Sequence, residues 1–327
     1  MSNAPVLKVE DLHVWFDLSG GRELHAVQGV SFELRAGERM GLVGESGCGK
    51  TTTILALMGL LPSSASAAGR VLLDGEDILA KGEETVSPHR WKDISMVFQG
   101  AMNAFNPVKT VGSQIAEPME MHGIASGKVA RAQVRRLLEL VGISGDRADR
   151  YPHEFSGGMR QRAAIALALA CEPKVLLADE PTTALDVMVQ AQILELLTQL
   201  TRDLGLSMVL VTHDLPVVAQ VCDRAAVMYA GEIVEMGDMA EIYHEPRHPY
   251  TRMLFAATPD MLGDDAVISI PGAPPRLDRE IVGCPFAPRC DSAFSPCAGT
   301  HPRRMEVAPG HEAMCHLNDR VTVEQPA

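Results

Sequence analysis

The sequence predicts an α/β fold built around a parallel sheet, and three observations lead to that prediction. Short apolar runs alternate with longer helical patterns over the first three quarters of the chain, as is typical of parallel sheets covered by helices. One of these runs passes through a Gly-rich turn directly into a helix. Proline then becomes frequent, with 12 of the 21 prolines from Pro246 onward, which marks a separate turn-rich tail.

The elements follow from the pattern of apolar residues. Five short apolar runs are expected as buried strands, namely Met40–Val43, Val71–Leu73, Ile94–Phe98, Val175–Ala178 and Met208–Thr212. Long helical patterns cover Lys128–Val141, Met159–Cys171 and Val187–Leu204. Leu7–Phe16 and Ala26–Leu34 alternate more strongly around Gly20-Gly21, which predicts antiparallel strands at one edge. The stretch Ser63–Ala68 is expected as a loop.

Composition and charge limit the class of protein. A chain of 327 residues has room for one large domain with an appendage or for two domains. We place the boundary near 240–250, with one domain over 1–245 and a Cys/Pro-rich extension over 246–327. With 46% hydrophobic and 22% charged residues, neither disorder nor a fibrous repeat fits. A net charge of -13 argues against a nucleic-acid partner.

The expected compartment is a cytosol. No apolar run approaches the roughly 18 residues that a membrane-spanning helix needs. The first ten residues lack a basic start followed by an apolar stretch, so a signal peptide is not expected. In a reducing compartment, the four cysteines between Cys284 and Cys315 favour metal or cofactor binding over disulfides.

Residues 44–51 read GESGCGKT and match the phosphate-loop pattern G-x-x-x-x-G-K-[ST]. They follow the expected strand Met40–Val43 and open a helix over Thr52–Gly59, the context that separates a phosphate loop from a chance match. Glycines let backbone N–H groups face phosphate oxygens, and the helix N-terminus adds a favourable dipole. Lys50 is expected at the β- and γ-phosphates and Thr51 at Mg²⁺.

Two carboxylates end the apolar run Val175–Ala178, where α/β sheets place their ligands. Asp179 is expected to hold Mg²⁺ through water, and Glu180 to polarise the attacking water or take its proton. The run Met208–Thr212 delivers His213 to the same edge. Strand ends that supply a lysine with a threonine, an acidic pair and a histidine favour a catalytic site over unrelated surface residues.

Residues 155–162 read FSGGMRQR, in which two glycines precede a long helix and Ser156 lies near its N-cap. Together with the phosphate loop, this stretch resembles the signature sequence of ATP-binding-cassette (ABC) ATPases. That family also places a glutamine at a strand end, matched by Gln99, and a loop after the second carboxylate, matched by Ala184-Leu185-Asp186. The resemblance implies a P-loop ATPase core with an antiparallel β edge, a helical subdomain over about 100–160 and the small C-terminal domain.

More narrowly, the chain resembles the oligopeptide, dipeptide and nickel importer ATPases. The match rests on GESGCGKT at 44–51, PTTALDVMVQAQIL at 181–194, HPYT at 248–251 and the cysteine-bearing tail. Gly100-Ala101 departs from the family pattern, in which Asp-Pro is frequent after the glutamine. The departure concerns the contacts that face the transporter rather than the nucleotide chemistry.

The resemblance implies that two such subunits close head-to-tail around two ATP molecules, and it assigns roles by position. The ATP-binding set is Phe16, Gly44, Glu45, Ser46, Gly47, Cys48, Gly49, Lys50, Thr51 and Thr52. The set that contacts the partner's ATP is Ser156, Gly157, Gly158 and Gln161, with Asp186 in the dimer loop. The residues implied to bind Mg²⁺ are Thr51, Gln99 and Asp179. The catalytic residues are Glu180, His213, Gln99 and Lys50.

An aromatic ring upstream of the phosphate loop stacks on adenine in this family. Trp15 and Phe16 both qualify, and they point to opposite faces if the segment is a strand. The family pattern favours Phe16. Either ring could instead belong to the core.

The tail cysteines Cys284, Cys290, Cys297 and Cys315 leave intervening gaps of 5, 6 and 17 residues. Structural zinc sites usually pair their ligands as C-x₂₋₄-C, and none of these gaps fits. From the spacing alone an iron–sulfur cluster, zinc, and free or bridged thiols all stay open. The resemblance to the importer family implies a [4Fe–4S] cluster on these four residues, with zinc as the alternative.

The function implied by the resemblance is ATP hydrolysis that drives import of di- or oligopeptides or a related solute such as nickel or glutathione-like peptides. The implied partners are a second ATPase subunit, with a paralogue favoured, two membrane permease subunits and, indirectly, an extracytoplasmic solute-binding protein. The implied location is peripheral, on the cytoplasmic face of the cell membrane. The sequence does not name the solute, because an ATPase subunit never touches it.

Two other functions compete with this one. ABC ATPases that act on ribosomes or DNA generally carry two cassettes or a nucleic-acid element, whereas this sequence shows one cassette and an acidic charge balance. A redox or metal-sensing module would not need an intact nucleotide site. The presence of Lys50, Asp179, Glu180, Ser156 and His213 argues against that function.

Overall fold

The structure is a computed structural model that describes residues 4–100, 104–257 and 269–319. Its contacts divide the chain into two compact units. The first unit comprises the chain up to Lys8, Glu33–Arg39 and Leu72–Leu210, and the second comprises Val9–Phe32, Met40–Val71 and the chain from Val211 onward. Each unit is described by itself below.

The first unit contains the predicted parallel strands β6 (Ile94–Val97) and β7 (Val175–Asp179). Their register runs from Ile94 opposite Val175 to Val97 opposite Ala178. β8 (Ser207–Thr212) follows β7 in the strand order. Every residue of these three strands is buried, which explains why the sequence shows continuous apolar runs rather than alternation.

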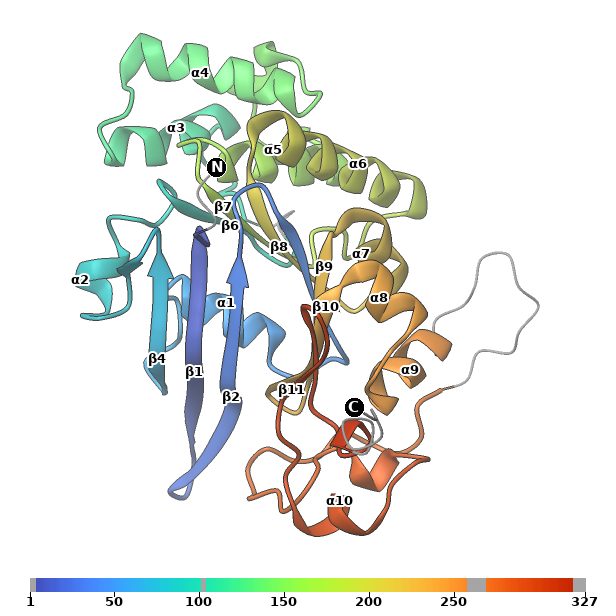
Figure 1. The fold of residues 1–327 in the computed structure, drawn as a ribbon. Helices are drawn as coiled ribbons and strands as arrows, with labels where there is room; N and C mark the ends of the chain where they lie inside the picture. The colour runs from blue at the N-terminus through green and yellow to red at the C-terminus, as the bar shows by residue number, and fades with distance from the viewer. Residues whose placement is uncertain (1–3, 101–103, 258–268, 320–327) are drawn as a thin grey trace. The chain divides into compact units, whose positions relative to one another are not determined.

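Helices make up most of the rest of the first unit (Figure 1). They are α2 (Glu83–Val86), α3 (Val111–Met121), α4 (Gly127–Leu140), α5 (Gly157–Ala168) and α6 (Val187–Leu204), with short 3₁₀ turns at Gly145–Asp149 and Pro152–Glu154. The bounds predicted for α6 are confirmed. α5 ends three residues before the predicted Cys171, because Pro173 disfavours helical backbone just ahead of it.

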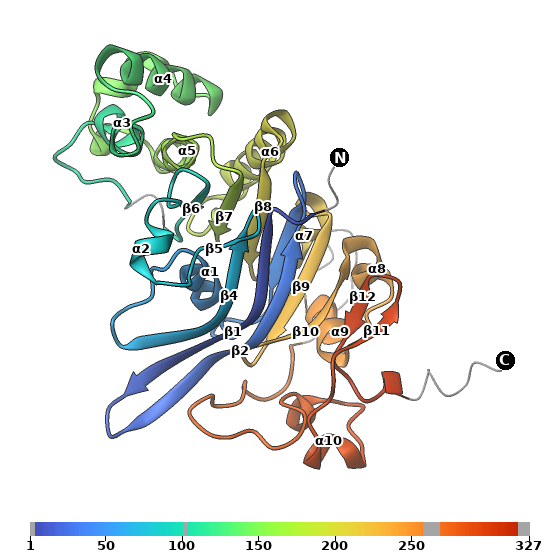
Figure 2. The same ribbon diagram turned by 60° about the vertical axis from the view of Figure 1, so that its left-hand side comes forward.

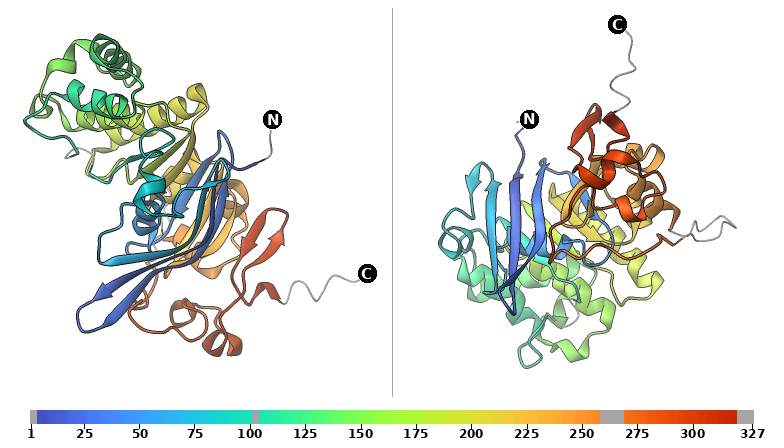
Figure 3. Two further views of the ribbon diagram at one scale, coloured as in Figure 1. Left: turned by 90° about the vertical axis from the view of Figure 1, so that its left-hand side faces the viewer. Right: turned by 90° about the horizontal axis from the view of Figure 1, so that it is seen from below.

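The second unit holds a sheet with the order β2-β1-β4, made of β1 (Leu7–Leu18), β2 (Arg22–Leu34) and β4 (Ala65–Leu73). The turn at Gly20-Gly21, where both glycines have positive φ, joins β1 to β2 and makes them antiparallel (Figure 3). These strands form a sheet of their own rather than extending the parallel one. β5 (Glu76–Asp77) pairs with Leu72 and Leu73 at the end of β4, and these four residues all belong to the first unit.

β4 corrects the loop predicted over Ser63–Ala68, because the strand already starts at Ala65. Small side chains gave no strand pattern there, yet backbone pairing with β1 needs none. Gly69 shows how close the two strands lie. A Cβ at this position would lie 2.4 Å from the carbonyl oxygen of Asp11.

The second unit also holds strands in the order β11-β12-β10-β9-β3. They are β3 (Arg39–Val43), β9 (Arg224–Tyr229), β10 (Glu232–Asp238), β11 (Met305–Ala308) and β12 (His311–Ala313). β3 runs parallel to β9, whereas β10 is antiparallel to both β9 and β12. The hairpin β11–β12 of the tail thus lies beside β10 (Figure 2). The helices are α1 (Lys50–Leu57), α7 (Leu215–Val221), α8 (Met239–His244), α9 (Pro249–Ala256) and α10 (Ser295–Gly299).

Candidate active site

The phosphate loop adopts a backbone that only glycine fits at two positions. Gly44 has a φ of 151°, and a Cβ there would lie 2.2 Å from the carbonyl oxygen of Met228. Gly49 has a φ of 108°, and a Cβ there would lie 2.6 Å from the carbonyl oxygen of Ala26. The predicted glycine pattern therefore reflects both dihedral freedom and close backbone approach on two sides.

Lys50 begins α1 and folds back over the loop. Its Nζ donates to the carbonyl oxygens of Gly44 at 2.8 Å and Glu45 at 3.0 Å, and the residue is only 6% exposed. Burial raises the pKa of the neighbouring Cys48 thiol, which therefore stays neutral beside the ammonium group. Two carbonyl oxygens thus hold the Lys50 ammonium group at the N-terminus of α1. A phosphate oxygen bound there would be a stronger hydrogen-bond partner for it than either carbonyl.

Gln99 and Glu180 meet at the ends of two adjacent parallel strands in the first unit. Gln99 Nε2 donates to Glu180 Oε2 at 2.9 Å, and Thr183 Oγ1 donates to the same oxygen at 2.8 Å. Glu180 adopts a φ of 42°, uncommon for a residue with a side chain. Asp179, one residue earlier, is 1% exposed. The sequence analysis did not identify Thr183. The available signal was a hydroxyl residue three positions after Glu180.

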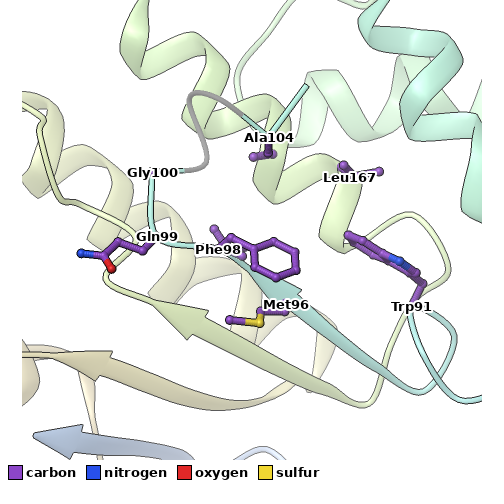
Figure 4. Close-up of a pocket in the computed structure, with 9 residues that line it drawn as sticks. Trp91, Met96, Phe98, Gln99, Gly100, Ala104 and Leu167 are labelled. Carbon is purple, nitrogen blue, oxygen red and sulfur yellow. The ribbon is translucent and has the colours of Figure 1, made fainter. Parts of the chain in front are cut away.

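An apolar pocket of about 310 Å³ lies next to Gln99 in the first unit. Its lining includes Trp91, Met96, Phe98 and, from α5, Leu167. Figure 4 shows the rings of Trp91 and Phe98 turned toward this space, whereas the amide of Gln99 points away from it. One residue therefore borders the pocket with its backbone and reaches the carboxylate of Glu180 with its side chain.

The predicted signature forms a capped helix start. Ser156 Oγ accepts from the N–H of Met159 at 3.3 Å as the N-cap of α5, and it lies at the surface. Asp186 caps α6 in the same way, accepting from the N–H of Val189 at 3.0 Å. Gln161 is buried, so among the residues predicted to contact a partner's ATP it offers the least surface.

Trp15 and Phe16 differ in what surrounds their rings. The Trp15 ring packs against the rings of His13 and His25, with centroid distances of 5.4 and 4.8 Å, and the two imidazoles lie 5.2 Å from each other. Burial, together with nearby His13, lowers the pKa of His25 and keeps the imidazole neutral in this stack. The three rings thus form one cluster, in which the indole already has two aromatic partners. Phe16 points to the opposite side of β1 and is half-buried.

His213 follows β8 and is exposed, directly before Asp214, which caps α7. His213, the phosphate loop and Phe16 belong to the second unit, whereas Gln99, Asp179, Glu180 and the signature belong to the first. The roles predicted for all of these residues toward ATP and Mg²⁺ stay predictions.

The four tail cysteines line one small pocket in the second unit, together with His248 and Phe286. The N–H of Cys284 donates to the carbonyl oxygen of Cys297 at 2.8 Å, which ties two of them together. Burial raises the pKa of the Cys315 thiol to about 11 and also raises the pKa of the Cys284 and Cys290 thiols, so these three are protonated at neutral pH until a metal displaces the proton. Within residues 4–100, 104–257 and 269–319, no three or more His, Cys, Asp or Glu side chains are already grouped to hold a metal ion.

In the described part of the chain, every helix is too short or too polar to cross a membrane.

Two family descriptions match the sequence. "ABC transporter" matches residues 27–183, and "Oligopeptide/dipeptide transporter, C-terminal region" matches residues 234–297. The second match covers the first three of the four tail cysteines.

Relatives match over nearly the whole chain. The chain is 47% identical to the dipeptide transport ATP-binding protein DppD of Bacillus subtilis, over 96% of this chain and 95% of that protein. It is 44% identical to the oligopeptide transport ATP-binding protein OppD of Escherichia coli, over 95% of this chain and 92% of that protein. Among solved structures, it resembles a dimeric post-hydrolysis state of the ATP-binding cassette MJ0796 bound to ADP and Pi. The TM-score is 0.63 and the identity 28%, over 71% of this chain and 98% of that one.

Proposed function

Because the chain belongs to the ABC transporter family of oligopeptide and dipeptide ATP-binding proteins, we propose that it hydrolyses ATP to drive import of di- or oligopeptides. Relatives named for peptide transport match it nearly end to end, and the second family description matches the tail. These matches favour import over an action on ribosomes or DNA.

The hydrogen bond from Gln99 to Glu180 is the observation that carries this proposal. Glu180 is the carboxylate proposed to polarise the attacking water, and Gln99 also borders the apolar pocket. A partner that fills the pocket can therefore shift Gln99 and change the orientation of Glu180. Hydrolysis and docking are coupled by one side chain, as a transport ATPase requires and a free hydrolase does not.

The nucleotide chemistry follows from charge and position. We assign Lys50 to the β- and γ-phosphates, Thr51 and Asp179 to Mg²⁺, and His213 to the γ-phosphate. Phe16 is the proposed adenine platform, because the indole of Trp15 is already packed in a cluster with two imidazoles. Such a site works by positioning and by neutralising charge, so each of these contacts adds to transition-state stabilisation.

A second ATPase subunit and a permease pair are the proposed partners. The capped start of α5 at Ser156 is exposed, as is the segment Asp186–Met188, so both can meet the ATP of a partner subunit. The pocket lined by Trp91 and Phe98 is the proposed seat of a cytoplasmic permease loop, with an apolar side chain inserted between the rings. The protein would then lie peripherally on the cytoplasmic face of the membrane.

We also propose that the tail holds a [4Fe–4S] cluster. Its four cysteines face one pocket from loop segments, which suits a four-thiolate cluster, and no pair has the C-x₂₋₄-C spacing of structural zinc sites. Such a cluster would replace four protons and cross-link the loops. Anaerobic purification with visible absorption and iron and sulfide analysis tests this. We expect Cys297→Ser to lose the cluster and Cys171→Ser, outside the tail, to keep it; a colourless protein with stoichiometric zinc would contradict it.

The experiment for the main proposal uses Glu180→Gln in proteoliposomes that contain the chain with its permease subunits. We expect ATP binding to stay within about twofold of wild type, whereas hydrolysis and uptake of a labelled dipeptide both fall by about 100-fold or more. Thr198→Ser in α6, which keeps the hydroxyl that donates to the carbonyl oxygen of Leu194, is a matched control that should leave both rates unchanged. Normal hydrolysis in Glu180→Gln would remove this residue from the mechanism. Hydrolysis without any peptide uptake would remove the import function.

A further inference from the structure

Arg289 reaches from the cysteine-bearing tail to the phosphate loop. Its Nη1 lies 2.6 Å from Glu45 Oε2 and its Nη2 lies 2.9 Å from Glu45 Oε1, so the ion pair is bidentate. The Arg289 side chain is only 4% exposed. Glu45 is the second residue of the loop GESGCGKT, and 244 positions separate it from its partner. A bidentate pair with a buried guanidinium fixes geometry much better than an exposed ion pair does.

The guanidinium is held on its other sides too. Its Nε donates to the carbonyl oxygen of Pro271 at 2.8 Å. Its carbon lies 5.8 Å from the ring centre of Tyr229 and 6.0 Å from that of Phe286, within the range of cation–π attraction. Arg289 is therefore locked in one orientation, and Glu45 is the carboxylate at which it points.

The tail region holds the backbone of Glu45 as well. The N–H of Glu45 donates to the hydroxyl of Tyr250 at 2.9 Å. Burial raises the pKa of Tyr250 well above its usual range, so its hydroxyl stays neutral and can accept this bond. The Tyr250 ring packs on Tyr229 and Phe286, with centroids 4.6 and 5.3 Å away. The same aromatic cluster thus supports both Arg289 and Tyr250.

This cluster is also part of the wall of the cysteine pocket. Phe286 lines that pocket together with Cys284 and Cys290, and the N–H of Arg289 donates to the carbonyl oxygen of Phe286 at 2.9 Å. Arg289 directly precedes Cys290 in the chain. Any change that reshapes the pocket must therefore move the backbone from which the Arg289 side chain extends.

A carboxylate in a phosphate loop works against its ligand. Glu45 carries a negative charge at a loop that has to accept a triphosphate, and like charges at close range weaken binding. Arg289 neutralises that charge and turns the carboxylate toward the tail. We propose that Arg289 is a positioning residue of the ATP site, through which the fold of the cysteine-bearing tail sets the affinity for ATP. This inference rests on the proposed ATPase function.

Substitution of both partners tests the proposal. Arg289→Gln leaves the partly buried carboxylate of Glu45 without its cation, and we expect the Kd for a fluorescent ATP analogue, measured in Glu180→Gln protein, to rise about tenfold or more. With Glu180 intact, the KM for ATP should rise in parallel and kcat at saturating ATP should stay within about twofold. Arg289→Lys keeps the positive charge but loses the bidentate geometry, so its Kd should lie between the values for Arg289 and for Arg289→Gln. The double variant Arg289→Gln/Glu45→Gln should recover most of the affinity, because the unpaired charge is gone.

Arg252→Gln is the matched control. Arg252 is also a tail-directed arginine, since it pairs with Asp291 just after Cys290, but it makes its bond at the surface. Its Kd should equal that of wild type. A Kd for Arg289→Gln within twofold of the control, or a double variant no better than Arg289→Gln, would overturn the proposal. If Arg289→Gln folds poorly, the Kd values of Arg289→Lys and of the single variant Glu45→Gln still test the proposal.

Linkage supplies a second readout that does not depend on turnover. If the tail sets ATP affinity, ATP must stabilise the tail by the same coupling free energy. We expect ATP to slow amide exchange in residues 284–297 of Glu180→Gln protein, and to do so much less once Arg289 is glutamine. Equal protection in both would contradict the coupling. Lys50→Ala separates the two hypotheses: if wild type and Lys50→Ala bind ATP equally, the proposed function fails and this inference with it, whereas loss of binding only in Lys50→Ala leaves the Arg289 comparison to decide.

Discussion

The phosphate loop and the cysteine-bearing tail are built by opposite means. The loop Gly44–Thr51 depends on neighbouring residues, because its glycines, its lysine and the start of α1 all fall within eight positions. The tail from residue 269 to 319 has little regular structure, and its position is fixed by contacts to distant parts of the sequence. Arg289 binds Glu45, and His311 binds Glu235. A motif whose residues are close in the sequence can be recognised from the sequence. A segment held by contacts to distant residues depends on the rest of its unit for its structure.

This difference explains what could be predicted. The sequence analysis identified Gln99 and Glu180 each at the end of an apolar run, and the structure brings their side chains together because β6 and β7 are adjacent parallel strands. The cap at Ser156 was visible from the local sequence, whereas the cap that Asp186 makes on α6 was not predicted. By contrast, β9 to β12 and the ion pair of Arg289 gave no local signal. Which distant carboxylate an arginine will meet depends on the complete fold.

The largest expected effect is in the loop, from Gly44→Ala. The added Cβ would lie 2.2 Å from the Met228 carbonyl oxygen, so the loop must move. Its backbone N–H groups would then no longer point at the phosphate oxygens. We expect ATP affinity to fall by about 100-fold, measured by titration with a fluorescent ATP analogue. Gly47→Ala is the control, because nothing lies within 4 Å of that position and only its positive φ is disfavoured. Equal losses in both would mean that dihedral freedom, and not space, fixes the loop.

The next effect is in the tail, from Glu235→Ala. This buried carboxylate accepts from the N–H groups of Arg247 at 2.6 Å and His248 at 3.0 Å, and from His311 Nε2 at 2.8 Å. Its loss leaves three buried donors unsatisfied, so we expect the free energy of unfolding to fall by about 3 kcal/mol in urea titrations. Glu245→Ala removes an exposed carboxylate paired with Arg247 and should change it by less than about 0.5 kcal/mol. Similar values for the two would show that Glu235 does not anchor the tail.

Phe16→Ala and Trp15→Ala separate a ligand-facing ring from a structural one on the same strand. We expect Phe16→Ala to weaken ATP binding by about tenfold, because a stacking platform is lost, with little change in unfolding free energy. Trp15→Ala should do the reverse, since it breaks the stack with His13 and His25 and leaves the adenine platform in place. Isothermal titration with ATP and thermal unfolding of each variant measure the two effects. If Trp15→Ala alone weakened binding, the adenine assignment would pass to the indole.

The smallest effect is expected from Arg252→Ala, which asks whether any tail contact matters or only the buried ones. Arg252 donates to Asp291 through one nitrogen, with Nη2 at 2.9 Å from Oδ1, whereas Arg289 uses two nitrogens, and about half of each side chain of the Arg252 pair is exposed. Water and salt screen such a pair, so its removal should change the free energy of unfolding by less than about 0.5 kcal/mol and leave ATP affinity unaltered. A loss as large as that of Arg289→Gln would show that the tail acts on the loop through its overall attachment. The expected contrast would instead assign the coupling to the buried guanidinium and the bidentate geometry of the Arg289 pair.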